Sequence, residues 1–557
     1  MLDLSRSAKL PPMENGAKAA RRNKAKDLSL TLLSILLLVL AFPDFNLWPL
    51  AWLGLVPLLV AIARKPAPRR AFFLGWFFGG AFFYATCYWL TYSIIHYGGL
   101  SPWQAYALLF PGALILGLFP GLFALIQARF ITIWGPRALF AAPLLWVALE
   151  WARLSVTGQL WNAIGYSQAF HPTFIQVARW GGVYAVGFLI VTVNAAIAFA
   201  LLKQTARALL ISSLIVAGAG GLLLVSGPPQ SFARPVLSKP AAVVIAVQPN
   251  VPMDPVKTDS EIEALLKRHI SLSTTALQHW DEGGEGNNNR GILADKNRAN
   301  DESSGGRKTI PRLVIWPESP MNFTYGNDPQ LRDQLARFAQ LNHTSLLFNS
   351  QESAPNDGFY NSALLINEEG RLIAQYDKIR LMPFGEYVPL PRWLPGSNQV
   401  RAIVGGFAPG YRYTSMPVGE MRAGVFICIE SAYPWIARTF TAEGAEVLIN
   451  ISNDGYLGPT PVMKQHLANT IFRAVENGRP VWRVTNTGIS AYISPHGDVR
   501  DATGGFQEAV RTWTISRQET GKTFYTKYGE LFVSVCSILS FLMLALSFKN
   551  KGVGVRV

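Results

Sequence analysis

Cysteine and histidine are scarce in this sequence, whose 557 residues include three cysteines and seven histidines. The histidines are scattered, and neither an HExxH nor a CxxC pattern occurs, so we expect no metal and no cofactor. Cys87 and Cys536 lie in long apolar stretches, which leaves Cys428 as the single cysteine of the polar part of the chain. That part cannot form a disulfide within one chain, and an unpaired thiol in an oxidising compartment is a liability unless it is buried or used.

Charged residues are also sparse, at 15% of the chain against 50% hydrophobic residues. Eight apolar stretches stand out, and they cover residues 28–40, 48–63, 71–95, 105–126, 138–152, 183–202, 208–225 and 531–548. About 20 apolar residues in a helix cross the ~30 Å hydrocarbon core of a bilayer, so we expect a polytopic α-helical membrane bundle of eight spans. The first stretch is followed by another apolar segment rather than a cleavage site, which argues against a signal peptide.

Basic residues outnumber acidic ones, 50 to 35, and much of the excess flanks the predicted spans. They lie in the N-terminal arm, in the loop 64–70 and at the C-terminus, whereas the turns after the first and third spans carry no positive charge. The positive-inside rule therefore predicts that both termini are cytoplasmic and that the polar domain is extracytoplasmic, or periplasmic in a cell with two membranes. Charge placed in this way orients spans and meets anionic lipid, so no nucleic-acid partner is implied.

These patterns predict the domain organisation. The expected parts are a basic cytoplasmic arm at 1–27, a seven-span membrane domain at 28–226, a polar domain at 240–515, an eighth span at 529–548 and a cytoplasmic tail at 549–557. Residues 281–308 are poor in apolar residues and rich in Gly, Asn and charge, which is typical of a disordered insertion.

The polar domain alternates strand-like and helix-like segments. Strands are expected at 241–247, 313–316, 345–348, 363–366, 423–429, 447–451 and 481–485. A helix is expected at 465–477, where Leu467, Ile471 and Ala474 recur at helical spacing and Gly478 supplies a C-terminal cap. The alternation by itself supports an α/β class.

Three polar residues follow apolar runs in this domain: Glu318 in LVIWPES, Lys378 in QYDKIRLMPFGE and Cys428 in GVFICIES. Taken singly, such a cysteine is usually a small core residue, and the two charges are usually solvated. Together they are the parts of an acyl-transfer site, because a thiol nucleophile needs a base for its proton and a nearby cation to favour its anion. The ammonium of Lys378 and the backbone N–H of Ile429 are the candidates for stabilising an oxyanion.

Several ordered motifs carry a family resemblance: WPES, YDKIRLMPFGEYVPL, the C-I-E run, NISNDGYLG, QHL and RAVENGRPVWRVTNTGISA. Together they resemble the carbon-nitrogen hydrolase (nitrilase-like) superfamily. The segments EWARL, LWNAIGYSQ and GGVYAVGF resemble its membrane-bound branch, the apolipoprotein N-acyltransferases. The resemblance implies an extracytoplasmic nitrilase-like αββα sandwich, with Glu318, Lys378 and Cys428 as its catalytic triad.

The resemblance also implies the reaction and its setting. A glycerophospholipid would donate an acyl chain to Cys428 as a thioester. The α-amino group of the N-terminal diacylglyceryl-cysteine of an apolipoprotein would then accept it, which completes lipoprotein maturation. The expected location is the bacterial cytoplasmic (inner) membrane, with the lipid bilayer as a partner and a monomeric protein.

Further residues match the family pattern. Glu386 resembles a second carboxylate near the triad, Glu430 a support for the nucleophile loop, and Asn361 and Trp161 residues near the substrate. The loop 384–394, which includes Tyr387, Pro389 and Trp393, is hypothesised to dip into the bilayer interface as a lid beside the pocket. The chain departs from the family at Ile429, where many members carry Tyr; the backbone N–H is unaffected by this difference.

Two other functions remain open from the sequence. One is a membrane-tethered nitrilase-like amidase that hydrolyses a small C–N substrate with the same triad, and this activity would survive removal of the spans. The other is a transporter whose outer domain only binds a ligand; its transport would survive the loss of the Cys428 thiol. The spans show no pair of broken polar helices at matching positions, which disfavours the transporter.

Overall fold

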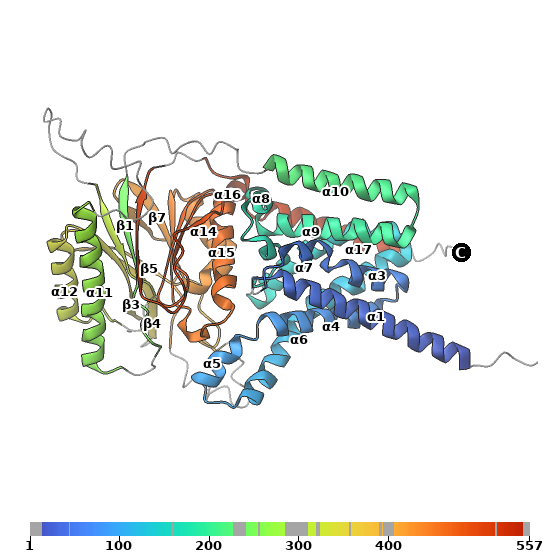
Figure 1. The fold of residues 1–557 in the computed structure, drawn as a ribbon, viewed down its shortest axis with the longest axis horizontal. Helices are drawn as coiled ribbons and strands as arrows, with labels where there is room; N and C mark the ends of the chain where they lie inside the picture. Colours follow the sequence, from blue (N-terminus) through green and yellow to red (C-terminus); the bar gives the residue numbers. More distant parts are fainter. Residues whose placement is uncertain are drawn as a thin grey trace, which may run out of the picture.

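The chain folds into a helical bundle beside a two-sheet sandwich (Figure 1). The computed structural model describes residues 14–43, 45–158, 160–226, 241–253, 257–283, 310–318, 323–355, 358–388, 393, 406–517 and 521–549. The insertion predicted at 281–308 lies outside the described residues, apart from residues 281–283.

The bundle is built from helices at both ends of the sequence. They are α1 (Glu14–Ala41), η1 (Trp48–Leu50), α2 (Ala51–Gly54), α3 (Val56–Arg64), α4 (Pro68–Thr86), α5 (Leu90–His96), α6 (Pro102–Trp134), η2 (Gly135–Ala141), α7 (Ala142–Thr157), η3 (Ile164–Gln168), α8 (Pro172–Ile175), α9 (Ala178–Lys203), α10 (Ala206–Ser226) and α17 (Leu531–Lys549). All eight predicted apolar stretches are largely helical.

Four helical stretches among the described residues are long and apolar enough to cross a membrane: α6 through α7, α9, α10 and α17. A fifth is added if α4 and α5, which meet at a bend of 55°, form one broken span. The described residues therefore include several helices long and apolar enough to cross a membrane, and the number of eight crossings stays a prediction.

The bend between α4 and α5 is where the bundle meets the sandwich. The carbonyl oxygen of Thr86 accepts hydrogen bonds from Trp89 Nε1 and from Gln465 Nε2 of the sandwich, each at 3.0 Å. An unpaired carbonyl in lipid costs several kcal/mol. The helix thus breaks at a point where the other body can satisfy the freed carbonyl.

The sandwich consists of two six-stranded sheets with orders β12-β1-β2-β3-β4-β5 and β11-β10-β9-β8-β7-β6. The strands are β1 (Ala242–Gln248), β2 (Arg312–Ile315), β3 (Ser345–Ala354), β4 (Gly358–Ile366), β5 (Leu372–Asp377), β6 (Ser415–Val418), β7 (Met421–Ile427), β8 (Val447–Ser452), β9 (Val481–Thr485), β10 (Ala491–Ile493), β11 (Val499–Arg500) and β12 (Ala509–Ile515). Helices α11 (Asp259–Asp281) and α12 (Pro329–Leu341) cover one outer face, and α14 (Pro434–Ala442) and α15 (Val462–Asn477) cover the other (Figure 1). The expected αββα layering is confirmed.

All seven predicted strands are present, but their ends differ in informative ways. β3 and β4 run further than predicted because they pair as one long hairpin from Leu346 opposite Ile366 to Ala354 opposite Gly358. The strand predicted to reach residue 429 ends at Ile427, because Cys428 has a φ of +51° and begins the turn η5 (Cys428–Ala432). The predicted helix 465–477 is most of α15, which Gly478 caps with a φ of +62°.

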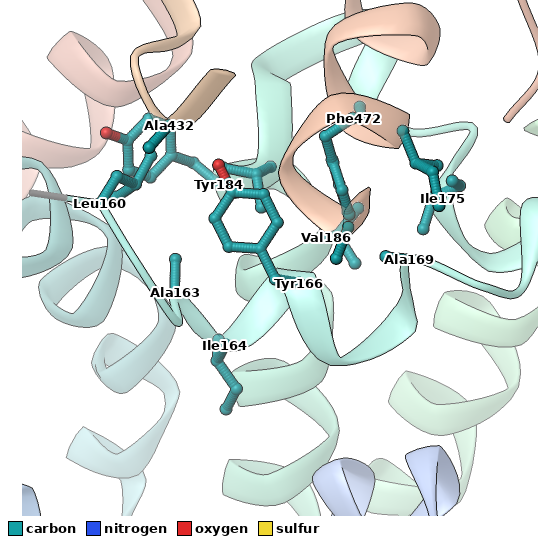
Figure 2. Close-up of a cluster of buried hydrophobic side chains, with 14 of the residues drawn as sticks. Leu160, Ala163, Ile164, Tyr166, Ala169, Ile175, Tyr184, Val186, Ala432 and Phe472 are labelled. Carbon is teal, nitrogen blue, oxygen red and sulfur yellow. The ribbon is translucent and has the colours of Figure 1, made fainter. Parts of the chain in front are cut away.

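Helix α15 lies on the outer face of the sandwich that packs against the bundle (Figure 1). Phe472 lies among side chains of α9 and of the segment before it, and its ring stands edge-on at 5.1 Å from the Tyr166 ring (Figure 2). Next to it, the buried Arg473 and Glu476 form an ion pair, with Nε and Oε2 2.9 Å apart. Glu476 Oε1 also accepts from Val183 N at 2.9 Å, beside the break in α9 at Gly181 and Gly182. The two bodies therefore share one buried core.

Candidate active site

The candidate triad gathers where strands of both sheets end. Glu318 follows β2 and Lys378 directly follows β5, both in one sheet, while Cys428 directly follows β7 in the other. Loops at strand ends hold side chains over a pocket with little backbone freedom. The face-to-face packing of the sheets thus brings together residues that are up to 110 positions apart in the sequence.

Lys378 is the centre of the charged cluster and is 1% exposed. Its Nζ lies 3.2 Å from Glu318 Oε1 and 2.9 Å from Glu386 Oε1. Burial opposes the positive charge, but the two carboxylates outweigh it and hold the pKa of Lys378 well above its usual value. The side chain is therefore a fixed ammonium and not a proton acceptor.

Asn361, in β4, ties the two carboxylates together. Its Nδ2 donates to Glu318 Oε1 at 2.9 Å and to Glu386 Oε1 at 2.7 Å. Its Oδ1 accepts from Asn349 Nδ2 at 2.7 Å, which fixes the orientation of the amide. Asn361 thus contacts both carboxylates from β4, the strand next to the edge strand β5.

The remaining oxygens of the two carboxylates accept from the backbone. Glu318 Oε2 accepts from Asn453 N at 3.1 Å, and Glu386 Oε2 accepts from Met382 N at 2.6 Å. Glu318 keeps 13% of its side chain exposed, so it lies at the edge of the cluster and not beneath it. A carboxylate held in this way can exchange a proton with a group that enters from the open side.

Cys428 is partly exposed, at the first position of η5. Partial burial among protein groups raises the pKa of its thiol by desolvation. The charge of Glu318 raises the pKa further, and the charge of Lys378 opposes both effects. The resting residue is therefore a thiol, which needs a base before it can attack.

The backbone conformation at Cys428 is unusual for a residue with a side chain. A φ of +51° costs of order 1 kcal/mol or more at a non-glycine residue and persists only where neighbours enforce it. Glu430 provides one restraint: fully buried, it accepts from Ile427 N at 2.7 Å, Ile379 N at 2.7 Å and Arg380 N at 3.0 Å. It thereby joins the turn after β7 to the turn after β5.

Glu430 is itself sensitive to protonation. Burial raises its pKa to about 7, against the opposing effect of the backbone N–H groups of Ile427 and Arg380. The hydroxyl of Tyr376 donates to both of its oxygens, at 2.9 and 3.0 Å. As a carboxylate, Glu430 accepts from all four donors, so its charged form is the one that holds both turns.

The residues expected near the substrate differ in how deeply they are buried and in which part of the molecule they contact. Trp161 is 6% exposed and donates from Nε1 to Gln465 Oε1 at 2.7 Å, so it lies at the contact between the two bodies. Ile429 is also buried, whereas Tyr387 is 40% and Trp393 79% exposed. Pro389 lies outside the described residues, and the lid hypothesis for the loop 384–394 stays a prediction.

Sequence reasoning missed a second charged group beneath the triad. His466, in α15, lies with Nε2 2.9 Å from Cys428 O and with Nδ1 2.7 Å from Asp454 Oδ1. Asp454 Oδ2 in turn accepts from Arg483 at 3.0 Å. The QHL motif contained His466 without any indication of its role. The only signal was that His466 and Arg483 fall within a predicted helix and a predicted strand, while Asp454 lies in the NISNDGYLG motif.

No group of three or more potential metal ligands occurs among the residues that the structure describes. The site as observed offers a thiol, two carboxylates, a buried ammonium and backbone N–H groups. These parts are sufficient for acyl transfer through a covalent intermediate.

Comparison with known proteins covers both bodies. Residues 34–196 match the family model of the apolipoprotein N-acyltransferase N-terminal domain, and residues 312–525 match that of the carbon-nitrogen hydrolases. A Geobacter metallireducens protein named apolipoprotein N-acyltransferase is 32% identical, over 95% of this chain and 96% of its own length. One of the same name from Rhizobium leguminosarum bv. trifolii is 30% identical, over 87% of this chain and 90% of its own length. Among solved structures, an amidase from Nesterenkonia sp. aligns with 15% identity and a TM-score of 0.36, over 53% of this chain and 96% of its own.

Proposed function

The chain belongs to the apolipoprotein N-acyltransferase family and is an enzyme that N-acylates lipoproteins, and from this premise we propose that Cys428, Glu318 and Lys378 carry out the transfer. The single observation that supports this assignment is the cluster at the strand ends, where a buried ammonium lies between two carboxylates beside the only cysteine of the sandwich. The match includes the membrane part as well as the sandwich, which favours acyl transfer over a tethered amidase and, with the enzyme class, excludes a transporter.

In the first proposed step, Glu318 takes the thiol proton and Cys428 Sγ bonds to the carbonyl carbon of a glycerophospholipid ester. The bond from that carbon to the glycerol oxygen breaks, and the oxygen takes the proton back from Glu318 as the lysophospholipid leaves. The acyl chain is now a thioester on Cys428. Lys378 and the N–H of Ile429 stabilise the negative oxygen that forms during the attack.

In the second proposed step, the α-amino group of a diacylglyceryl-cysteine attacks the thioester. Glu318 accepts a proton from the amine, the C–S bond breaks, and the sulfur recovers a proton from Glu318. The products are an amide on the lipoprotein and a free thiol on the enzyme. A thioester suits this exchange because amines attack it more readily than the original ester, provided that the site excludes water.

The substrates explain why the sandwich is joined to a membrane bundle. Moving an acyl chain from bilayer to water costs about 0.8 kcal/mol for each methylene, or on the order of 10 kcal/mol for a ~16-carbon chain. An enzyme that meets the chain at the bilayer surface avoids most of that cost. We expect the exposed Tyr387 and Trp393, which follow Glu386 in the sequence, to contact that surface.

The proposed setting is the bacterial inner membrane, with a monomeric enzyme, cytoplasmic termini and a periplasmic sandwich. Basic residues flanking α1, α3 and α17 on the predicted inner side support it. Labelling by a membrane-impermeant maleimide tests this topology: a cysteine at the exposed Gln330 should react from the periplasmic side, and one at Lys549 should not. The reverse pattern would contradict it.

Mass spectrometry of the purified full-length protein tests the chemistry. After incubation with a glycerophospholipid, we expect an acyl adduct on Cys428 that hydroxylamine releases and that a diacylated lipopeptide consumes. Cys428→Ala should carry no adduct, and Glu318→Gln should slow its formation by about 10²-fold or more, because a positioned base contributes 10²–10⁴ in rate. Cys536→Ala, which removes a buried thiol of α17, is the matched control and should acylate normally. An unacylated Cys428 in an enzyme that still transfers acyl groups would contradict the proposal.

A further inference from the structure

The charged group beneath the nucleophile has no part in the reaction described so far. His466 is 3% exposed, and both of its ring nitrogens are within hydrogen-bond distance of an oxygen. Nε2 faces the carbonyl oxygen of Cys428, and Nδ1 faces a carboxylate oxygen of Asp454. The main chain at the nucleophile therefore contacts a buried polar network.

The hydrogen-bond partners of this histidine identify the ring nitrogen that donates to the peptide group of Cys428. A carbonyl oxygen can only accept a hydrogen bond, so Nε2 carries a proton. Burial favours a neutral Asp454, but the charges of His466 and Arg483 outweigh it and hold the pKa of Asp454 below its usual value. Asp454 Oδ1 lies 2.7 Å from Nδ1, on the other side of the ring, and holds the imidazole in this orientation.

The ring of Trp161, in the bundle, lies against the ring of His466. The two ring centroids are 5.7 Å apart, and the ring planes are tilted by 51°. Gln465, the preceding residue, accepts from Trp161 Nε1 at 2.7 Å and from Trp89 Nε1 at 3.0 Å. Two tryptophans of the bundle thus fix the part of α15 that presents His466 to the active site.

The carbonyl that His466 contacts belongs to the peptide group whose N–H is that of Ile429. A hydrogen bond donated to a peptide oxygen polarises the whole group and makes its N–H a stronger donor. The same bond restrains a peptide plane that the positive φ of Cys428 leaves under strain. We propose that His466 is a positioning residue that orients and polarises the Cys428–Ile429 peptide so that the Ile429 N–H stabilises the oxyanion.

This inference rests on the proposed thioester chemistry, and it predicts a selective defect. Acylation of Cys428 by an ester passes through an oxyanion. Alkylation by iodoacetamide is a direct displacement at a saturated carbon and needs no oxyanion donor. Loss of His466 should therefore slow acylation and leave alkylation nearly unchanged, whereas a general disturbance of the thiol, the base or the fold would slow both.

The experiment compares both rates in the full-length detergent-solubilised protein, with a glycerophospholipid as acyl donor. We expect His466→Leu to slow acylation by about 10–100-fold, because loss of a whole oxyanion donor costs about 10²–10³-fold and this variant only weakens one. Alkylation should change by no more than about 3-fold. His466→Gln, whose amide can donate to the same carbonyl, should recover much of the acylation rate. His496→Leu is the matched control, because His496 also bridges the two bodies, through Gln176, but lies outside the site.

Two results would overturn the inference: an equal fall of acylation and alkylation in His466→Leu, or no fall in acylation. Melting temperatures of the variants show whether each is folded, and the His466→Gln comparison applies if the leucine variant is not. If the unaltered protein forms no acyl adduct at all, the thioester proposal fails, and this inference fails with it.

Discussion

A buried lysine between two carboxylates controls the charge around Cys428. Lys378 lowers the pKa of the thiol, while desolvation and Glu318 raise it, and the net result is a pKa above the usual value. Because alkylation needs the thiolate, the rate of reaction with iodoacetamide should keep rising as the pH increases from 7 to 9. Removal of Lys378 should raise the pKa of the thiol further, because the lysine's charge lowers it, and should leave a smaller thiolate fraction at any given pH.

Lys378→Met should therefore slow the alkylation of Cys428 at pH 8 by about 10-fold or more, since an adjacent opposite charge shifts a pKa by one to three units. Lys464→Met, which removes an exposed lysine of α15, is the control and should change the rate little. A Lys378→Met rate equal to that of the unaltered protein would show that the ammonium does not act on the sulfur.

The residues of this site differ in how far the sequence could predict them. Glu318, Lys378 and Cys428 each follow an apolar run, so their placement at strand ends could be anticipated. Asn361 lies inside β4, and its contact with two carboxylates depends on the sheet register, which no local pattern encodes. The contact of His466 with Cys428 O depends in addition on how α15 packs against the second sheet.

Helix α15 carries the sandwich's contact with the bundle. The buried pair of Arg473 and Glu476 lies on this helix, and Glu476 also accepts from Val183 N at the break in α9. A buried charge that loses its partner costs about 3–5 kcal/mol, whereas an apolar pair of similar volume can replace both charges at little cost. The contact should therefore tolerate the loss of both charges better than the loss of one.

Thermal unfolding of the full-length protein tests this expectation. Glu476→Gln, which retains an acceptor for Val183 N but removes the charge, should lower the melting temperature clearly. The double variant Arg473→Met/Glu476→Leu should lower it less. The control is Glu263→Gln in α11, which breaks an exposed pair with Lys267 and should cost at most about 1 kcal/mol. Additive losses in the double variant would mean that the two charges do not act as a pair.

The strands and helices could be predicted from the sequence where buried apolar residues recur at a regular spacing. The strands with long buried apolar runs were expected, whereas β5 and β6 are edge strands and are partly exposed, so neither gives a clear pattern. In the bundle, the stretch at 71–95 is continuous in hydropathy but bends by 55° between α4 and α5. The carbonyl of Thr86 at this bend accepts from Gln465 of the sandwich, a residue far away in the sequence, so no local pattern could indicate the contact.

In the molecule as a whole, the bundle bonds to the part of α15 that contacts Cys428 in the candidate site. The carbonyl of Thr86 and the side chains of Trp89 and Trp161 all bond to Gln465, which precedes His466. A sandwich without these partners would expose the side of α15 that carries Phe472 and the Arg473–Glu476 pair. Membrane attachment alone should therefore not be sufficient for activity.

A chain restricted to residues 241–549 separates membrane attachment from packing against the bundle, because it keeps α17 but lacks α1–α10. We expect it to melt without a cooperative transition and to form no acyl adduct on Cys428. Supplying residues 1–226 as a second polypeptide should restore both properties, since buried contacts between the two pieces include the Glu476–Val183 bond and the Phe472–Tyr166 pair. Trp161→Ala in the second polypeptide should weaken the restoration, whereas Trp103→Ala, at a highly exposed position of α6, should not.

Full acylation by residues 241–549 alone would contradict the expectation that the sandwich must pack against the bundle. Hydrolysis of small amides by that piece would favour the tethered amidase, because such an enzyme needs neither the bundle nor a lipid donor.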